Sequence, residues 1–266
     1  KRDQWNLDEK DYFPSEALSR QELNEWLGIN EELRLAAART FSSFYYGEQG
    51  AKLISAQLSL EAPTLEARKF LATQTMDEAR HVETFERILN LLDQIQPINP
   101  FLNALLADVY RAPLFAEKLV GMNLLVEGLA LSAFRATVAA LKPGDNISEK
   151  GFRAVGAPIQ AIIRDESRHV GFGVILLKDV LSQLNRRQKM KLRLRQAWWL
   201  CLLYGSVKYH QKDQELLGID YLSLLNTVIE DHERRLTECG ANTLLSTQKM
   251  TRMIPSIDRI VDQLRR

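Results

Sequence analysis

The sequence predicts an all-α protein. Glycine and proline are scarce, with 13 and 8 residues among 266, and the prolines fall at apparent breaks between long segments. Apolar residues recur at helical spacing within those segments, whereas the alternation of β-branched residues that is typical of strands is almost absent. A chain of this length can bury a sizeable core. We therefore expect one helical domain over residues 1–266.

Four long helices are expected to form a core over about 30–184. They cover about 30–61, 64–95, 114–141 and 148–184. Pro63 suits the first turn of the second helix, and KPGDN at 142–146 stops the third. Gly156, followed closely by Pro158, predicts an irregular start to the fourth helix.

Additional helices are expected at both ends of this core. Residues 1–28 predict an irregular lead with one short helix, and residues 97–113 predict a connection that carries another. A C-terminal helical extension covers about 186–266. Its helices are expected over about 187–214, 220–236 and 249–265. The apolar segment AWWLCLLYGSV at 197–207 predicts a buried helix or the surface of a homodimer, and the alternative is a role at a membrane surface.

Composition and charge argue against several classes of protein. Apolar residues are 45% and charged residues 26%, and the net charge of +1 gives no reason to expect nucleic acid as a partner. The longest apolar stretch, at 119–134, is shorter than the ~20 residues of a membrane span and contains Glu127, so no span is expected. Cys201 and Cys239 cannot build a disulfide framework, and KRDQWNLDEK lacks the apolar region of a signal peptide. We therefore expect a cytoplasmic protein.

The chain contains two related pentapeptides, DEARH and DESRH, which begin at Asp77 and Asp165. In each, a Glu and a His three residues apart project from one face of a helix, and the neighbours on that face are apolar. A carboxylate on a stripe that faces the core is costly unless it is paired or bound to a metal. The candidate metal ligands of the two motifs are Glu78, His81, Glu166 and His169.

A site for two metals in a helical bundle also needs one Glu from each of two other helices. Glu127 is the one acidic residue between Leu119 and Leu141, and Glu48 lies on a helix face with Phe44. The same half-motif therefore occurs twice along the chain. Four carboxylates and two imidazoles suit two iron ions, or one manganese and one iron, whereas a structural zinc site would favour thiolates. We expect no catalytic side chain beyond these six ligands.

Neighbouring side chains are expected to support the ligands. Asp77 and Asp165 lie four residues before the histidines of their own motifs, and a metal-binding histidine usually donates its other ring N–H to a carboxylate. The alternative is a local ion pair with Arg80 or Arg168. Tyr45, near Glu48 in sequence, is either a redox-active neighbour of the metals or a packing residue with a hydrogen-bonded hydroxyl.

Glycines lie close to the candidate ligands in sequence. A glycine inside a helix costs about 1 kcal/mol relative to alanine, so its presence calls for a reason. One reason is a cavity or a π-bulge at the site, and the other is close packing of helices. The residues concerned are Gly47, Gly50, Gly128, Gly171 and Gly173.

The six candidate ligands and the two pentapeptides resemble the ferritin-like diiron-carboxylate superfamily. The resemblance covers about 40–185 and is nearest to the branch of ribonucleotide reductase small subunits, bacterial multicomponent monooxygenases and arylamine N-oxygenases. Three positions depart from those patterns. Phe85 stands where a radical-forming reductase subunit carries a Tyr, Ile162 where an arylamine N-oxygenase carries a His, and Leu131 where a monooxygenase often carries a Thr.

The resemblance implies a ferritin-like four-helix bundle with additional helices, and a non-haem dimetal oxidoreductase. Its cofactor would be two iron ions, or manganese and iron, with dioxygen as co-substrate. Its activity would be that of an oxygenase or oxidase, such as a monooxygenase, acting on a small organic substrate with an apolar part. The chain has no cluster of cysteines and no evident nucleotide motif, so an external electron donor, a ferredoxin or a reductase, is expected. The expected substrate pocket is lined by Phe44, Phe85, Leu124, Leu131, Phe134 and Ile162.

Two other functions fit the same ligands. One is a radical-generating subunit like that of ribonucleotide reductase, which serves a partner enzyme. The other is a ferroxidase or iron-handling protein with no organic substrate. The apolar surroundings of the ligands and the extra C-terminal helices argue against the iron-handling function, and Phe85 argues against a stable tyrosyl radical.

Overall fold

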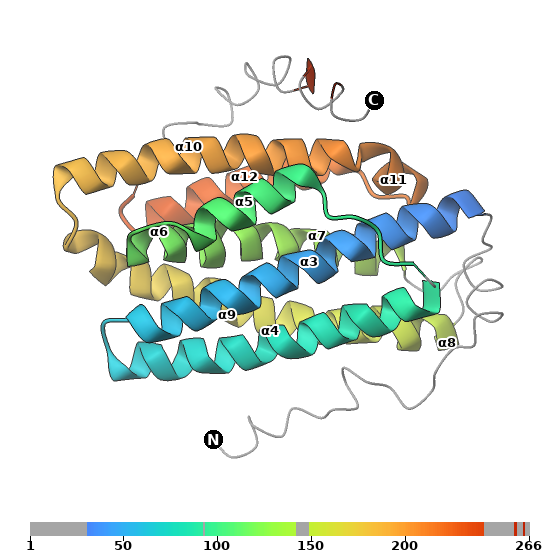
Figure 1. Ribbon diagram of the computed structural model, residues 1–266, viewed down its shortest axis with the longest axis horizontal. Helices are drawn as coiled ribbons and strands as arrows, with labels where there is room; N and C mark the ends of the chain where they lie inside the picture. Colours follow the sequence, from blue (N-terminus) through green and yellow to red (C-terminus); the bar gives the residue numbers. More distant parts are fainter. Residues whose placement is uncertain (1–30, 93, 142–148, 242–257, 260–262, 264–266) are drawn as a thin grey trace.

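Four long helical segments lie along one another in the computed structural model (Figure 1). The described residues are 31–92, 94–141, 149–241, 258–259 and 263. The first two segments are α3 (Glu31–Glu61) and α4 (Leu65–Leu92), which form an antiparallel hairpin. At its turn the Thr64 hydroxyl accepts a hydrogen bond from the backbone N–H of Ala67 at 3.1 Å, which caps the start of α4.

The third segment is continuous and contains a π-helical stretch. It passes from α6 (Phe115–Leu119) through the π-helix η1 (Val120–Val126) into α7 (Glu127–Ala140). The backbone N–H of Glu127 therefore donates to the carbonyl of Met122, five residues back instead of four. By length and composition this segment could cross a membrane, but 72% of its most apolar window is buried in the bundle. It occupies the position of a core helix.

The fourth segment begins irregularly, as the sequence predicts. After the short α8 (Glu149–Gly151), the π-helix η2 (Phe152–Gly156) leads into α9 (Ala157–Ser182). The backbone N–H of Ala157 donates to the carbonyl of Phe152, again five residues back. Pro158, which has no N–H to donate to the preceding turn, lies in the first turn of α9 directly after η2.

Outer helices cover one side of the four segments. They are α5 (Pro100–Tyr110), α10 (Arg186–Tyr209), α11 (Gln211–Leu216) and α12 (Tyr221–Glu238). The prediction of one unbroken helix over 187–214 is wrong, because the helix breaks at His210 and resumes as α11. The helix expected within 1–28 lies outside the described residues, as does nearly all of the one expected over 249–265.

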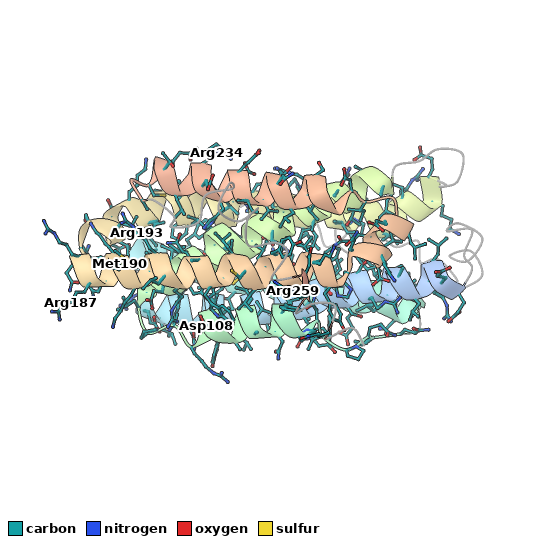
Figure 2. The ribbon with its side chains drawn as sticks, turned by 90° about the horizontal axis from the view of Figure 1, so that it is seen from above. Asp108, Arg187, Met190, Arg193, Arg234 and Arg259 are labelled. Atoms are coloured by element: carbon teal, nitrogen blue, oxygen red, sulfur yellow. The ribbon has the colours of Figure 1, made fainter. Side chains whose placement is uncertain are left out.

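The segment at 197–207 packs mainly inward. Trp199 is fully buried and its indole N–H donates to a carboxylate oxygen of Asp108 at 2.7 Å, whereas Trp198 is exposed. Toward its start the same helix presents charged side chains to solvent, and Figure 2 shows Arg187 at the exposed beginning of this helix.

The bundle core consists of two apolar clusters, with the candidate ligands between them along each helix. On α3 one cluster holds Phe41 and the other Ile54, on either side of Glu48. On α4 the order is reversed, with Leu71 before the DEARH motif and Phe85 after it, because the two helices are antiparallel. The six ligand positions therefore lie at one height in a bundle that is apolar on both sides.

Candidate metal centre

The structure brings all six candidate ligands together. Glu48 comes from α3, Glu78 and His81 from α4, Glu127 from the start of α7, and the remaining pair from α9. Each of the six residues is at most 3% exposed. Their ligand atoms form two groups, within each of which the atoms lie within 4.8 Å of one another. The groups are Glu48, Glu78, His81 and Glu166, and Glu78, Glu127, Glu166 and His169.

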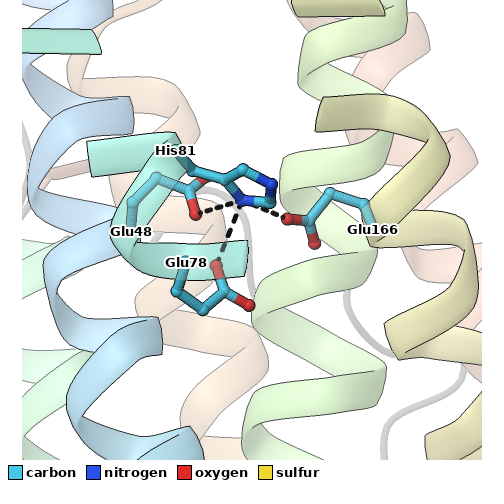
Figure 3. Close-up of side chains that lie close together, drawn as sticks. All are labelled: Glu48, Glu78, His81 and Glu166. Atoms are coloured by element: carbon cyan, nitrogen blue, oxygen red, sulfur yellow. Dashed lines mark hydrogen bonds and ion pairs between the residues drawn. The ribbon is translucent and has the colours of Figure 1, made fainter. Parts of the chain in front are cut away.

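The first group surrounds one ring nitrogen of His81. Its Nδ1 lies 3.3 Å from a carboxylate oxygen of Glu48, 3.3 Å from one of Glu78 and 3.2 Å from one of Glu166 (Figure 3). The carboxylates arrive from three different helices and converge on the same nitrogen. Such convergence of buried acceptors on one point is the arrangement that a bound cation requires.

The second group repeats this arrangement around His169. Its Nδ1 lies 3.2 Å from Glu127, 3.2 Å from Glu78 and 3.9 Å from Glu166. Glu78 and Glu166 belong to both groups, whereas Glu48 and Glu127 belong to one each. The site is therefore two similar halves that share a central pair of carboxylates.

The buried carboxylates call for positive charge that the described residues do not fully supply. Glu78 Oε2 and Glu166 Oε1 both lie near Nδ1 of His81, but neither buried oxygen has a hydrogen-bond partner. Burial, together with the negative charges of Glu166 and Glu78, raises the pKa of Glu48 and of Glu127 well above its usual value. Four carboxylates held this closely repel one another, and two divalent cations would remove both the repulsion and the orphaned acceptors. The residues thus fit a two-metal cofactor.

The supporting aspartates bind the histidines crosswise. Asp165 Oδ2 lies 3.2 Å from Nε2 of His81, and Asp77 Oδ2 lies 3.2 Å from Nε2 of His169. The expectation that each aspartate serves the histidine of its own motif is therefore wrong in its pairing. An aspartate one turn before a histidine on the same helix lies beside it, whereas the imidazole reaches toward the facing helix, where the other motif lies.

The ion pairs considered as an alternative are also present. Arg80 pairs with Asp77 and Arg168 pairs with Asp165, each within its own motif. Arg168 also approaches Asp77 at 3.5 Å. Each aspartate thus accepts from an arginine on its own helix while it faces the histidine of the other helix. The arginines orient the aspartates, and the aspartates orient the rings.

Two polar residues that sequence reasoning missed complete the second half. Gln74 donates through Nε2 to Glu127 at 2.7 Å and, at 3.4 Å, to Glu78. Asn123 donates to the side-chain oxygen of Gln74 at 3.0 Å and to the backbone carbonyl of His169 at 3.2 Å. Signals for both exist in the sequence, because each lies four residues before a ligand and Asn123 interrupts an apolar run.

A cavity of about 90 Å³ adjoins the ligands. Glu48, Glu127 and Glu166 form part of its wall. Of the pocket residues expected from the sequence, Phe44 and Phe134 line it. The other four are buried outside its lining: Phe85, Leu124, Leu131 and Ile162.

The position of Phe85 shows why the expected lining included residues that do not reach the cavity. Its ring packs against those of Phe44 and Phe134, each with a centroid distance of 5.4 Å, so it supports the cavity wall from behind. Tyr45 lies beside Tyr46 at a centroid distance of 5.4 Å and hydrogen-bonds to Gln49. Its role beside the metals stays a prediction.

Solved structures share this arrangement of helices. One is a Synechococcus protein with aldehyde deformylating oxidase activity, which is 19% identical with a TM-score of 0.69 and covers 84% of this chain and 98% of its own. Another is an R2-like ligand-binding oxidase with an aerobically reconstituted Mn/Fe cofactor, which is 21% identical with a TM-score of 0.65 and covers 88% of this chain and 93% of its own. The chain therefore has the ferritin-like helical bundle fold. No family model and no curated protein matches the sequence.

Proposed function

We propose that this protein is a dimetal oxidase that uses dioxygen to oxidise a small organic substrate with an apolar part. The observation that carries the proposal is the cavity whose wall includes three of the six candidate ligands. A site for iron handling alone has no need of an apolar chamber beside the metals. The structural neighbours, which are oxidases, support the same conclusion.

The metals would be held in the two halves of the site. His81 and Glu48 would bind one ion and His169 and Glu127 the other, with the two shared carboxylates between them. A pair of iron ions, or manganese with iron, supplies Lewis acidity and electrons when bound. Because the Nε2–H of each ring faces an aspartate, each Nδ1 keeps its lone pair for the metal.

The protein itself orients the ligands and excludes water. Gln74 holds Glu127 in place by its hydrogen bond, so that this carboxylate keeps one orientation beside the cavity. Phe44 and Phe134 form an edge-to-face pair with a centroid distance of 4.9 Å at the cavity wall. Dry, apolar walls strengthen electrostatic interactions at the centre and protect a reactive oxidant from solvent.

The proposed reaction needs electrons from outside. Insertion of one oxygen atom of dioxygen into a C–H bond, with reduction of the other to water, consumes two electrons and two protons besides the substrate. We infer an external donor, a ferredoxin or a reductase, because the two cysteines, Cys201 and Cys239, are isolated thiols and cannot hold an iron–sulfur cluster.

The test begins with protein loaded with Fe(II) without air, with iron counted per chain before dioxygen is admitted. Two ions per chain and dioxygen consumption that increases with a small organic molecule support the proposal. Repeated iron turnover with mineral formation would instead establish the iron-handling function, and a persistent radical signal in the EPR spectrum would establish the radical-generating one. As a control on the ligands, His81→Ala and Glu127→Ala should each bind fewer than two ions.

A further inference from the structure

One end of the cavity, which lies away from the candidate ligands toward the start of α3, is polar. Thr40 and Ser43 line it from α3, about two turns and one turn before Glu48, and His210 lines it from the break between α10 and α11. Ser206 and Gln214 complete this polar end. The rest of the lining is apolar apart from the candidate ligands: Phe44, Ala130 and Phe134 lie toward the polar end, and Ala51, Met122 and Val126 lie on the other side of the ligands.

A network of hydrogen bonds holds the polar end in place. Arg39 donates to both carboxylate oxygens of Asp213, at 2.8–3.1 Å, and Asp213 lies 3.2 Å from Nδ1 of His210. Burial opposes ionisation of Asp213, but hydrogen bonds from His210 and Arg39 outweigh it and lower the pKa of this carboxyl. Nε2 of His210 then lies 3.0 Å from the hydroxyl of Ser43. A partly buried ion pair thus fixes one imidazole at the cavity wall.

Two polar atoms at this end have no partner among the residues that the structure describes. Thr40 is 6% exposed, and its hydroxyl oxygen is buried without a hydrogen bond; the side-chain oxygen of Gln214 is buried and unpartnered as well. Buried polar groups in proteins are almost always satisfied, and a threonine inside a helix can bond to the carbonyl one turn back. The hydroxyl of Thr40 makes no such bond to the carbonyl of Ala36, so it is available to a ligand.

We propose that this polar end is a binding subsite for a neutral hydrogen-bonding group of the substrate, a hydroxyl or a carboxamide. The inference rests on the proposed function, because it assigns an orientation to the molecule that is oxidised. With its polar group at Thr40 and Gln214, the substrate presents its apolar part to Glu48, Glu127 and Glu166. The bond that is oxidised is therefore a C–H bond remote from the polar group.

The charges around the cavity favour a neutral group over an ionised one. None of the described residues that line it is a lysine or an arginine, and Arg39, behind the polar end, is already paired with Asp213. A carboxylate placed there would be buried without a counter-ion, which is costly. A hydroxyl or a carboxamide can both donate and accept, and so can match a threonine hydroxyl and a glutamine side chain.

The size of the cavity points to a compact molecule. Its volume is about 90 Å³. Suitable probes are therefore small and matched in shape. We choose 1-butanol as the neutral amphiphile, 1-chlorobutane as its apolar counterpart and butanoate as its anionic counterpart.

The experiment measures binding of these probes to metal-loaded protein under anaerobic conditions, so that no turnover occurs. Thr40→Val removes the hydroxyl but keeps the shape of the side chain, and Thr137→Val is the matched control, because Thr137 is similarly buried but bonds to the carbonyl of Ala133. We expect 1-butanol to bind more tightly than 1-chlorobutane and butanoate. Thr40→Val should weaken binding of 1-butanol by about five- to tenfold, as expected for one lost hydrogen bond. Binding of 1-chlorobutane should not change.

Three results would overturn the subsite. They are tighter binding of butanoate than of 1-butanol, equal effects of Thr40→Val and Thr137→Val, and no binding of any probe up to its solubility limit. The iron count and dioxygen consumption of the same preparation are recorded separately. If these fail while the probe preferences hold, the proposed function is wrong and the subsite stands; the reverse outcome removes the subsite alone.

Discussion

At the scale of single residues, the crosswise contacts between aspartates and histidines carry the most information. Each half of the site depends on both motifs, because the aspartate of one motif orients the histidine of the other. Neither pentapeptide can therefore form a complete half alone. Loss of one aspartate should therefore weaken the binding of the metal ion held by the histidine of the other motif.

Asp77→Asn is expected to weaken metal binding at the His169 half by roughly 10–100-fold, the usual cost of losing a carboxylate behind a ligand histidine. The matched variant Asp165→Asn should weaken the His81 half. Metal occupancy of the two halves, refined in crystals grown at limiting metal, distinguishes them. If each variant instead empties the half of its own motif, the crosswise assignment is wrong.

His232 gives a second prediction at this scale. It is 1% exposed, and burial together with the charge of Arg235 lowers its pKa to about 4. In the unfolded chain the pKa is about 6.5, so the unfolded state binds more protons between these values and stability falls as the pH drops through this window. The loss at the low end is on the order of 3 kcal/mol. Denaturant unfolding at several pH values should show a shallower pH dependence in His232→Leu; equal slopes would contradict the prediction.

At the scale of helices, the π-helix η1 positions the ligand Glu127 and the supporting residue Asn123 in the same part of the site. It lies directly before Glu127 and contains Asn123, so an extra residue in one turn changes the direction in which these two side chains project. The facing helix α9 approaches it closely at Gly173. A Cβ atom added there would lie 2.6 Å from Cβ of Asn123. Close packing is therefore the reason for this glycine.

Gly173→Ala is expected to destabilise the protein by about 1–3 kcal/mol, because the neighbouring atom is fixed to the backbone of η1 and cannot move aside. Gly171→Ala, on the same helix, is the control. An added Cβ there meets nothing within 4 Å, so the change should stabilise α9 by up to about 1 kcal/mol. Thermal unfolding of both variants measures the difference in sign. Two variants of equal stability would show that the contact at Gly173 can relax.

At the scale of the whole molecule, the metals should contribute to stability as well as to chemistry. The six ligands sit between two apolar clusters that bury both ends of the site. Without metal, this layer leaves mutually repelling carboxylates in the middle of the core. Binding of cations to the folded chain alone therefore favours the folded state.

Removal of the metals with a chelator is expected to lower the melting temperature. Free metal at about 100 times its dissociation constant adds about 2.7 kcal/mol. In a chain of this size each kcal/mol corresponds to roughly 2–4 °C. Differential scanning calorimetry before and after chelation gives the shift, and re-addition of Fe(II) should reverse it. An unchanged melting temperature would show that the ligands do not bind metal in the folded chain.

Sequence alone determined the helical fold, the irregular start of α9 and the faces on which the candidate ligands lie, and the structure brings those six residues together. These features depend on local periodicity: a helix has one spacing, so Glu and His three residues apart always share a face. Tertiary structure decided the crosswise aspartates, the roles of Gln74 and Asn123, and which pocket residues reach the cavity. These features depend on how the helices rotate and shift against one another. Periodicity places Phe85 on the inward face of its helix, but only the packing decides whether such a side chain lines the cavity or lies in the core behind it.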